Sequence, residues 1–362
     1  MAAPLRVALV GGPMYDRLYE VFEPGEVEIV VHADHPTLNR EVARLLADGE
    51  RIDILATHSK YAPSQEQWLR PLDDLVDAMA VGALAPLAVD LCRVDDTLRS
   101  LPRLIDVRVL WLRSDRVAAV PDSWDDLLAQ GVRFGFPGRE SGLFGTFFEL
   151  VVGAGGALYD DGRPTMNTPE AEQAVATLCR LAAQAPPDLP SWHYDDVDAA
   201  LLDGRVDAAG AWPGSWGSIR DHADAATLEP HPYPRGSARR VSYAGCHSWA
   251  IPTTCGDLDG AVAMLHRLVS ADAQAIDAAG GTMCAHSAAL AAVVPTDERD
   301  ARRLAITRAT IDEAMITYPP HARFPEVEDA GWSAINSALR GETSPRAAVD
   351  AVQSMALRVL AD

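Results

Sequence analysis

The stretch Ile52–Tyr61, IDILATHSKY, passes from apolar to polar residues within one short segment. Its first half, Ile52–Ala56, has the length and the branched side chains of a buried β-strand. The polar residues Thr57–Tyr61 follow at once, so they lie at the carboxyl end of that strand. The segment therefore predicts a strand that presents functional side chains where it ends.

Two more apolar strands are predicted before this segment, at Leu5–Val10 and Val27–Ala33. Helical periodicity over Leu38–Ala47 separates the second of them from Ile52. Strands that alternate with helices imply a parallel sheet that is covered on both faces. Because ligands bind beyond the carboxyl ends of such strands, the topology predicts that Tyr15 lies beside Thr57–Tyr61.

The rest of the chain continues this α/β pattern, and its 362 residues fit two globular lobes. Helices are predicted to begin after the N-caps Ser123, Thr168 and Ser344, the last two of which are followed by proline. Further strands are predicted at Arg108–Leu112, Arg133–Phe136, Asp207–Trp212 and Ser248–Ile251.

The charge of the chain limits its partners. A formal net charge of -21 argues against nucleic acid and against an anionic membrane surface, because both bind basic surfaces. No run approaches the roughly 20 apolar residues of a transmembrane helix. Lys60 is the single lysine among 31 basic residues, which makes its place at a predicted strand end conspicuous.

Five cysteines, widely spaced and without a CxxC pair, predict reduced and mostly buried thiols rather than a disulfide framework. Cys246-His247 and Cys284-Ala285-His286 do not have the spacing of a zinc motif, so neither a metal site nor a cofactor is predicted. A nucleophile elbow, a Walker loop, an early GxGxxG and an HExxH motif are all absent from the sequence. These observations favour binding over catalysis.

Six groups of segments, in this order, resemble the carbohydrate-binding proteins of ABC importers, the maltose-binding protein superfamily. They are IDIL at 52–55 with PLDDL at 71–75, LP at 101–102 with DVRVLW at 106–111, SWDDL at 123–127, LDGRVDAA at 202–209 with WP at 212–213, GCHSWAIP at 245–252, and FPEV at 324–327 with GETSP at 341–345.

The resemblance implies a periplasmic-binding-protein-like fold of type II, with two discontinuous α/β lobes joined by hinge crossings and a ligand cleft between them. The first lobe is expected at residues 1–107 with 252–315, and the second at 108–251 with 316–362. The implied function is to bind a small polar ligand, above all a sugar, an oligosaccharide or a sugar derivative. The chain, as a monomer, would deliver it to the permease of an ABC importer.

This role implies an extracytoplasmic protein, at the cell surface or in the periplasm, whose export signal has been removed. No signal precedes the strand at Leu5–Val10, so a native start at Met1 would instead make the protein cytoplasmic. A cytoplasmic enzyme or a ligand sensor built on the same fold is the alternative function.

A sugar site needs aromatic platforms for ring faces and planar polar groups for hydroxyls. Trp212 and Trp216 lie in a Gly/Pro turn after a predicted strand, where core packing explains them poorly. The resemblance makes Trp212 a sugar-stacking position, and it makes Arg323 a residue that reaches into the cleft. Packing is the alternative for Trp216, and a surface salt bridge is the alternative for Arg323. Asp106 and Arg108 occupy alternate positions of one expected strand, so they point together towards a ligand or towards each other.

The second expected crossing contains Gly245, Cys246 and His247, where a glycine lets backbone amides approach a ligand. Lys60 follows the predicted strand Ile52–Ala56. Because an ammonium is compact, its side chain there would contact an acidic or strongly accepting group of the ligand. The topology adds four candidate residues beyond the carboxyl ends of the first strands: Tyr15, His58, Ser59 and Lys60.

Overall fold

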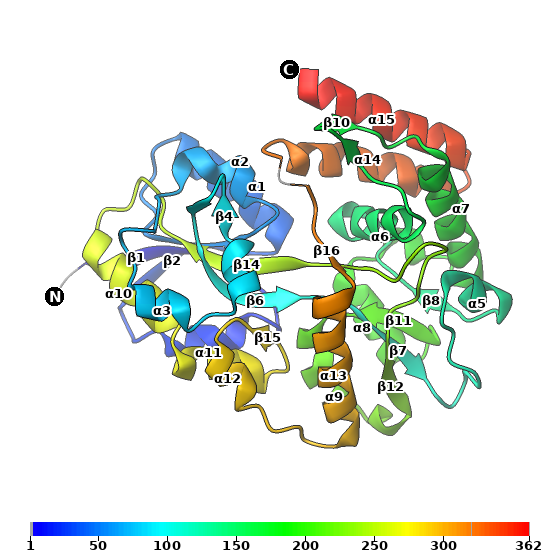
Figure 1. Ribbon diagram of the computed structural model, residues 1–362, viewed down its shortest axis with the longest axis horizontal. Coiled ribbons are helices and arrows are strands. Elements are labelled where there is room, and N and C mark those ends of the chain that lie inside the picture. Colours follow the sequence, from blue (N-terminus) through cyan, green and yellow to red (C-terminus); the bar gives the residue numbers. More distant parts are fainter. Residues whose placement is uncertain (1–2, 320, 362) are drawn as a thin grey trace. The chain divides into compact units, whose positions relative to one another are not determined.

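The structure is a computed structural model, and it describes residues 3–319 and 321–361. The described chain divides into two compact units, each with a sheet and helices of its own, which are labelled in Figure 1. Unit 1 contains the chain up to Asp106 and Gly245–Val294, with a short link that ends at Ala322. Unit 2 contains Val107–Ala244, Pro295–Pro319 and the chain from Arg323 onward.

The units and the predicted lobes share most of their residues, but besides Val107 and the short link that ends at Ala322 they differ in two longer segments. Residues 245–251 were expected in the second lobe, yet they contribute a strand to the sheet of unit 1. Residues 295–315 were expected in the first lobe, yet helix α13 (Glu298–Glu313) packs on strands of unit 2. The division into lobes that move as bodies stays a prediction.

Unit 1 is built on a six-stranded sheet in the order β15-β6-β14-β3-β1-β2. Strand β1 pairs in parallel with both β2 and β3, as predicted. A wholly parallel sheet is wrong, because β14 enters the sheet from the opposite end and runs antiparallel to β3 and β6. The strands are β1 (Leu5–Val10), β2 (Val27–Ala33), β3 (Ile54–His58), β6 (Leu101–Asp106), β14 (Gly245–Ala250) and β15 (Met283–Cys284).

The helices of unit 1 begin where the local sequence supplies a cap. In α1 the side chain of Asp34 accepts the backbone N–H of Thr37 at 2.8 Å, so the helix begins three residues before the predicted Leu38. The helices are α1 (His35–Ala47), α2 (Ala62–Gln65), α3 (Ala78–Gly82), α4 (Pro86–Asp90), α10 (Leu258–Leu268), α11 (Ala271–Ala279) and α12 (Ser287–Ala291), and a small hairpin joins β4 (Arg93–Val94) to β5 (Thr97–Leu98).

Unit 2 has a four-stranded sheet in the order β12-β7-β11-β8. Its strands are β7 (Val109–Arg113), β8 (Phe134–Gly135), β11 (Ala208–Ala211) and β12 (Leu228–His231), of which the first three match predicted strands. Unit 2 also contains two short two-stranded sheets. One pairs β9 (Tyr159–Asp160) with β10 (Arg163–Pro164), and the other pairs β13 (Ser242–Tyr243) with β16 (Met315–Ile316).

The predicted N-caps of unit 2 are confirmed. Ser123 accepts the backbone N–H of Asp126 at 3.1 Å, and Thr168 accepts that of Ala171 at 3.3 Å. Besides α13, the helices are α5 (Trp124–Ala129), α6 (Glu140–Gly153), α7 (Pro169–Gln184), α8 (Tyr194–Leu202), α9 (Trp216–Asp221), α14 (Phe324–Leu339) and α15 (Pro345–Ala361).

Helix α6 is the central helix of unit 2, because every residue after Glu140 is buried. Helix α14 packs directly on it: a Cβ at Gly331 would lie 2.8 Å from Cε2 of Phe144, so only glycine permits this approach. An apolar surface on all sides is typical of a helix enclosed by protein. Neither α6 nor any other helix of the described chain is long and apolar enough to cross a membrane.

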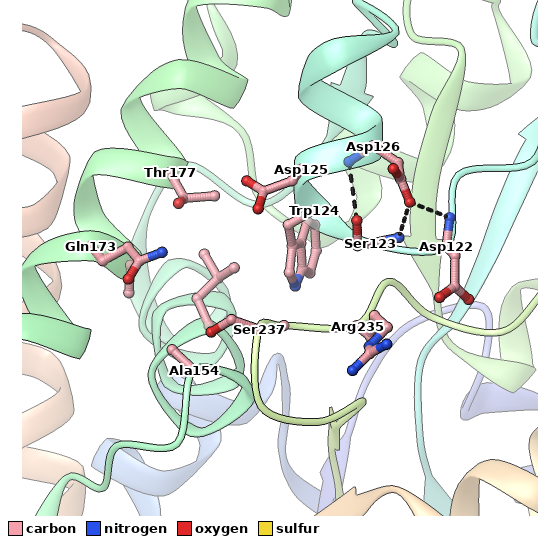
Figure 2. A pocket seen from close by; sticks show the side chains of 13 residues that line it. Asp122, Ser123, Trp124, Asp125, Asp126, Ala154, Gln173, Thr177, Arg235 and Ser237 are labelled. Atoms are coloured by element: carbon pink, nitrogen blue, oxygen red, sulfur yellow. Dashed lines mark hydrogen bonds between the residues drawn. The ribbon is translucent and has the colours of Figure 1, made fainter.

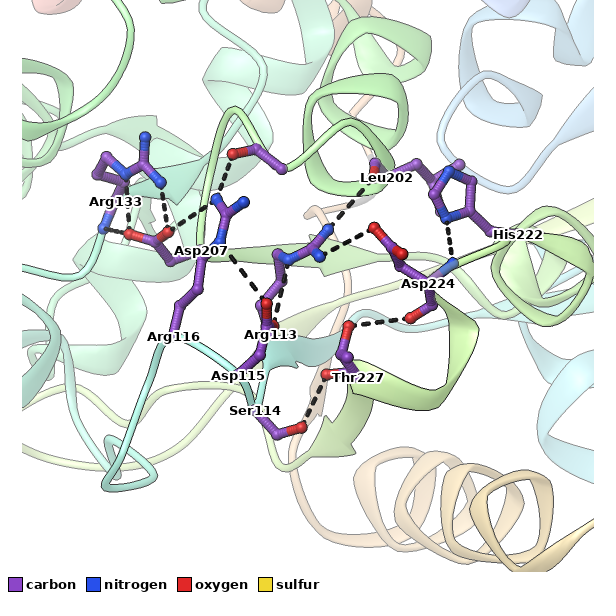
Figure 3. Close-up of polar contacts among 11 residues, drawn as sticks. Arg113, Ser114, Asp115, Arg116, Arg133, Leu202, Asp207, His222, Asp224 and Thr227 are labelled. Atoms are coloured by element: carbon purple, nitrogen blue, oxygen red, sulfur yellow. Dashed lines mark hydrogen bonds and ion pairs between the residues drawn. The ribbon is translucent and has the colours of Figure 1, made fainter.

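Ion pairs fasten the strand ends of unit 2, as Figure 3 shows. Arg133 donates to Asp207 through both its backbone N–H, at 3.2 Å, and its Nε, at 2.9 Å. Burial opposes ionisation of Asp207, but these contacts hold its pKa below the ordinary value. Arg113 reaches Asp224 at 3.1 Å from the neighbouring strand. The first pair therefore fixes β8 to the start of β11, and the second fixes the end of β7 to the segment before β12.

Candidate functional site

Aromatic and titratable side chains gather at one edge of the unit 1 sheet. Because β1, β2 and β3 are parallel, their carboxyl ends meet there, and antiparallel β14 begins at the same edge. The ring centroid of His247 lies 4.5 Å from that of His35 and 4.9 Å from those of His58 and Tyr15. We call Tyr15, His35, His58, Tyr61 and His247 the imidazole cluster. The predicted proximity of Tyr15 to Thr57–Tyr61 is present.

A hydrogen-bonded chain runs through the imidazole cluster. The Oδ2 atom of Asp106 lies 2.6 Å from Nε2 of His247, and Nδ1 of His247 lies 2.8 Å from Nε2 of His35. An ionised carboxylate only accepts, so Nε2 of His247 carries a proton, and in neutral His247 the other nitrogen accepts from His35. The hydroxyl of Tyr15 lies 3.2 Å from the same Nε2 atom. Asp106 thereby fixes the orientation of two imidazoles.

His58 packs against Gly245 from the neighbouring strand. A Cβ at position 245 would lie only 1.8 Å from Cε1 of His58, so the ring occupies the space that glycine leaves. The side-chain space at this glycine is therefore filled by His58, and contact of its backbone with a ligand stays a prediction. The backbone N–H of Lys60 donates to Nδ1 of His58 at 3.0 Å, which leaves the proton of neutral His58 on Nε2.

Two histidines of the cluster, His35 and His58, are held in their neutral form. Burial is the main cause that lowers the pKa of His35 and of His58 well below the ordinary value. The positive charge of Lys60 lowers both values further, and that of Arg103 lowers the pKa of His35. Neutral imidazoles combine a donor with an acceptor, which suits them to polar ligand groups.

Ser59 and Cys246 have structural partners at the edge of the cluster. The hydroxyl of Ser59 accepts the backbone N–H of Cys246 at 3.0 Å, and the backbone N–H of Ser59 donates to the carbonyl of Cys246 at 2.8 Å. Alternation along β14 turns the Cys246 side chain away from His247. Its thiol is fully buried, and its Sγ lies 3.8 Å from Sγ of Cys92. All five cysteines are free.

A metal centre is not formed by the cluster. His247 uses both ring nitrogens on protein partners, Asp106 and His35, and does not direct a lone pair to a shared point. Among the described residues, no group of three or more His, Cys, Asp or Glu side chains is arranged to hold a metal ion.

Asp106 and Arg108 do not share a strand, contrary to the prediction. Strand β6 ends at Asp106, and Arg108 precedes β7 in unit 2, because the chain passes from one sheet to the other between them. Arg108 is buried, pairs with the Glu149 carboxylate and donates to Oγ1 of Thr146 at 3.2 Å. The negative charge of Glu149 raises the pKa of Arg108 despite burial, so the guanidinium stays protonated. This pair gives Arg108 a structural role in unit 2.

Trp212 and Trp216 occupy different surroundings. Trp216 is 2% exposed and stacks on Trp111, with 5.8 Å between ring centroids, so core packing explains it well. Trp212 is partly exposed and meets the ring of Tyr243 edge-on at 5.7 Å. The ring centroid of Tyr194 lies 6.3 Å from that of Trp212. We call Trp212, Tyr194 and Tyr243 the aromatic cluster of unit 2.

Arg323 precedes α14 and pairs with an acidic residue of its first turn. Its Nη2 and Nε atoms donate to the Glu326 carboxylate at 2.6 and 3.0 Å. The Arg323 side chain is half-buried and that of Glu326 is exposed, and their pairing fits the salt-bridge alternative for Arg323. Ligand contact by each of the predicted site residues stays a prediction.

Sequence reasoning missed His35 in unit 1 and Tyr194 and Tyr243 in unit 2, whereas Tyr61 lies within the predicted stretch Thr57–Tyr61. His35 comes two residues after β2, so the topological rule that selected Tyr15 and His58 could have found it. Tyr194 begins α8 and Tyr243 ends β13, far apart in sequence, and only the folding of unit 2 brings them to Trp212.

Unit 2 also contains a pocket of about 340 Å³ beside the start of α5, which is shown in Figure 2. Trp124 lies in the middle of the lining residues in this view, with Asp125, Gln173 and Arg235 around it. The capping box of Ser123 and Asp126 fixes the backbone at one side. None of the predicted site residues lines this pocket.

The fold is similar to that of several proteins of known structure. The structure is similar to that of maltose-bound T. maritima MalE3, with a TM-score of 0.86 and 20% identity over 98% of this chain and 99% of that chain. The GacH receptor of Streptomyces glaucescens GLA.O, solved unliganded and with acarbose, gives a TM-score of 0.84 and 18% identity over 100% of both chains.

A solute-binding protein of an ABC transporter from Agrobacterium radiobacter K84, in complex with ribitol, is similar at a TM-score of 0.85 and 19% identity, with 99% of this chain and 98% of that chain covered. These likenesses confirm the predicted two-part α/β fold of the maltose-binding type. The family model described as bacterial extracellular solute-binding protein matches residues 18–275, which is more than half of the sequence. The chain belongs to the family of bacterial extracellular solute-binding proteins.

Proposed function

We propose that this protein binds a small polyhydroxylated solute, a sugar or a sugar derivative, outside the cytoplasm and delivers it unchanged to the permease of an ABC importer. Membership of the solute-binding family supports the binding role. The similar proteins MalE3, GacH and the Agrobacterium protein were solved with maltose, acarbose and ribitol, which supports this class of solute.

The observation that carries the sugar assignment is the partly exposed Trp212 in the aromatic cluster of unit 2. Tyr243 meets its ring edge-on, and the guanidinium of Arg108 lies 5.4 Å from its centroid, so the indole is held in place. A fixed aromatic face is the surface on which the apolar face of a sugar ring stacks. We further propose that the protein acts as a monomer.

Differential scanning fluorimetry with maltose, ribitol and other sugars and polyols tests the proposal. A sugar present at 100 times its dissociation constant should stabilise the protein by about 2.7 kcal/mol. Chromatography of the recovered sugar should find it chemically unchanged. If no sugar or polyol raises the melting temperature, or if one is consumed, the proposed function is wrong.

Trp212→Ala tests the platform itself, with Trp332→Ala as the matched control. Both tryptophans are partly exposed and pack against the core of unit 2, but Trp332 lies within α14. We expect Trp212→Ala to weaken sugar binding by at least about 1 kcal/mol, while Trp332→Ala leaves affinity unchanged. Equal affinity in the two variants would assign Trp212 to packing.

A further inference from the structure

Two of the five free cysteines lie in contact inside unit 1. Cys92 lies just after α4, Cys246 is the second residue of β14, and their Sγ atoms are 3.8 Å apart. Both side chains are fully buried. No other two cysteines of the described chain are hydrogen-bonded to each other. The fold therefore selects one pair of thiols from positions that are 154 residues apart in the sequence.

Small polar groups surround the Cys92 thiol. Ser100 lies just before β6, and Ser248 follows Cys246 by two positions on β14, so these two side chains leave the strand on the same face. Beyond Cys92, the Oγ atoms of both serines are buried and have no hydrogen-bond partner within the described residues. The polar surroundings of this thiol are therefore complete without any group from outside the chain.

The two thiols differ in their tendency to ionise. Burial opposes ionisation of Cys92, but the Cys246 thiol and the hydroxyls of Ser100 and Ser248 hold the pKa of Cys92 below its ordinary value. Burial raises the pKa of Cys246 well above the ordinary value. Because the thiolate is the nucleophilic form of cysteine, Cys92 is the attacking member of the pair.

The contact needs a small movement to become a covalent bond. A disulfide holds its sulfur atoms about 2.05 Å apart, so the two Sγ atoms must approach each other by about 1.8 Å. Rotation about the Cα–Cβ bonds divides this movement between the two side chains. Disulfides persist in oxidising compartments outside the cytoplasm, which is where the proposed function puts the protein.

We propose that Cys92 and Cys246 form a disulfide bond under oxidising conditions, such as those outside the cytoplasm. This inference rests on the proposed function only for the location of the protein. The bond joins the segment after α4 to the strand that carries His247 of the imidazole cluster. A crosslink over 154 residues removes much of the freedom of the unfolded chain, so it stabilises the folded protein.

Thiol–disulfide exchange supplies the oxidation, with a small disulfide such as oxidised glutathione as the oxidant. The Cys92 thiolate attacks one sulfur of the oxidant, which breaks its S–S bond and releases one glutathione thiolate. The Cys246 thiolate then attacks Sγ of Cys92, forms the protein disulfide and releases the second glutathione thiolate. The two protons that the protein thiols lose are taken up by the two glutathione thiolates. Because the finished fold buries both thiols, the exchange takes place before β14 has docked on β3 and β6.

Refolding in a glutathione redox buffer tests the proposal, with refolding in dithiothreitol as the reference. The oxidised protein should lose the mass of two hydrogen atoms, and peptide mapping should join Cys92 to Cys246. Alkylation after denaturation should then label only Cys179, Cys255 and Cys284. The melting temperature should rise by roughly 5 °C or more and fall back when the bond is reduced. The inference is wrong if all five thiols are still free after oxidative refolding, or if the crosslink joins other cysteines.

Alanine variants identify the pair that causes the rise. Cys92→Ala and Cys246→Ala should each abolish the redox-dependent rise in melting temperature, whereas Cys284→Ala, which changes another buried cysteine of unit 1, should retain it. Each variant is compared with itself in the two buffers, so packing lost through the substitution does not affect the result. A rise that persists in Cys92→Ala would overturn the inference.

Sugar binding by the reduced and the oxidised protein separates this inference from the proposed function. Intact sugar binding without a crosslink would refute the disulfide alone. A crosslinked protein that binds no sugar or polyol would support the disulfide and count against the proposed function alone.

Discussion

Replacement of Gly245 by alanine probes the packing that orients the imidazole cluster. The new Cβ would lie 1.8 Å from Cε1 and 2.0 Å from Nε2 of His58, whereas carbon atoms in contact are about 3.5–4.0 Å apart. The backbone of Gly245 does not have a positive φ and accepts alanine. The ring of His58 must therefore move by about 1.5–2 Å. That movement breaks its contact with the Lys60 N–H.

Two contributions set the expected loss of stability in Gly245→Ala. Overpacking of a tight site costs about 1–3 kcal/mol, and the lost hydrogen bond adds about 0.5–1.5 kcal/mol. We expect Gly245→Ala to reduce the free energy of unfolding by about 2–4 kcal/mol, measured from urea midpoints by circular dichroism. Gly82→Ala is the control in the same unit: nothing lies within 4 Å of its Cβ. Gly82→Ala should raise the free energy of unfolding by about 0.4–1 kcal/mol.

A double variant decides whether a clash with His58 causes the loss of stability in Gly245→Ala. With His58→Ala the obstructing ring is gone, so Gly245→Ala should cost at least about 1 kcal/mol less in that background than in the wild-type chain. A Gly245→Ala variant within about 0.5 kcal/mol of wild type would refute the packing argument. The argument would also be refuted if Gly245→Ala destabilised the His58→Ala variant as much as it destabilises the wild-type chain.

Two further predictions concern buried charges in unit 2. Glu149→Gln should lower the free energy of unfolding, measured in urea, by about 3–5 kcal/mol, because the buried guanidinium of Arg108 loses its counter-charge. A decrease below about 1 kcal/mol would contradict this role of Glu149. Burial raises the pKa of Asp198 to about 6, above that of an unfolded carboxyl. Its contribution to stability is therefore present at low pH and is lost as the pH rises through about 6. Asp198→Asn should stabilise the protein more at high pH than at low pH, and a stability difference that is independent of pH would argue against the shift.

Elements with local signals were predictable from the sequence. Ser123 and Thr168 accept the N–H groups expected of N-caps, and β1 and β2 have the bounds of their apolar runs. The proximity of Tyr15 and His58 also followed, because it depends only on the order of strands in a parallel sheet.

Features that depend on distant partners were not predictable. Arg108 is enclosed by Glu149 from a helix that begins 32 residues later in the chain, and nothing in the local sequence marks that pairing. Trp216 stacks on Trp111 of strand β7, which only the folding of unit 2 brings near. His35 is the exception, because the rule that found its neighbours applies to it equally.

The enclosure of α6 has a consequence for synthesis of the chain. The helix ends at Gly153, and α14, which packs on it through Gly331, is complete only at Leu339. At about 5–20 residues per second, a ribosome needs roughly 10–40 s to make the intervening segment. During that interval Phe144, whose ring meets Phe324 of α14, lacks its final cover, so the nascent chain exposes an aggregation-prone surface. Unit 2 can therefore reach its native packing only after its last helices have left the ribosome.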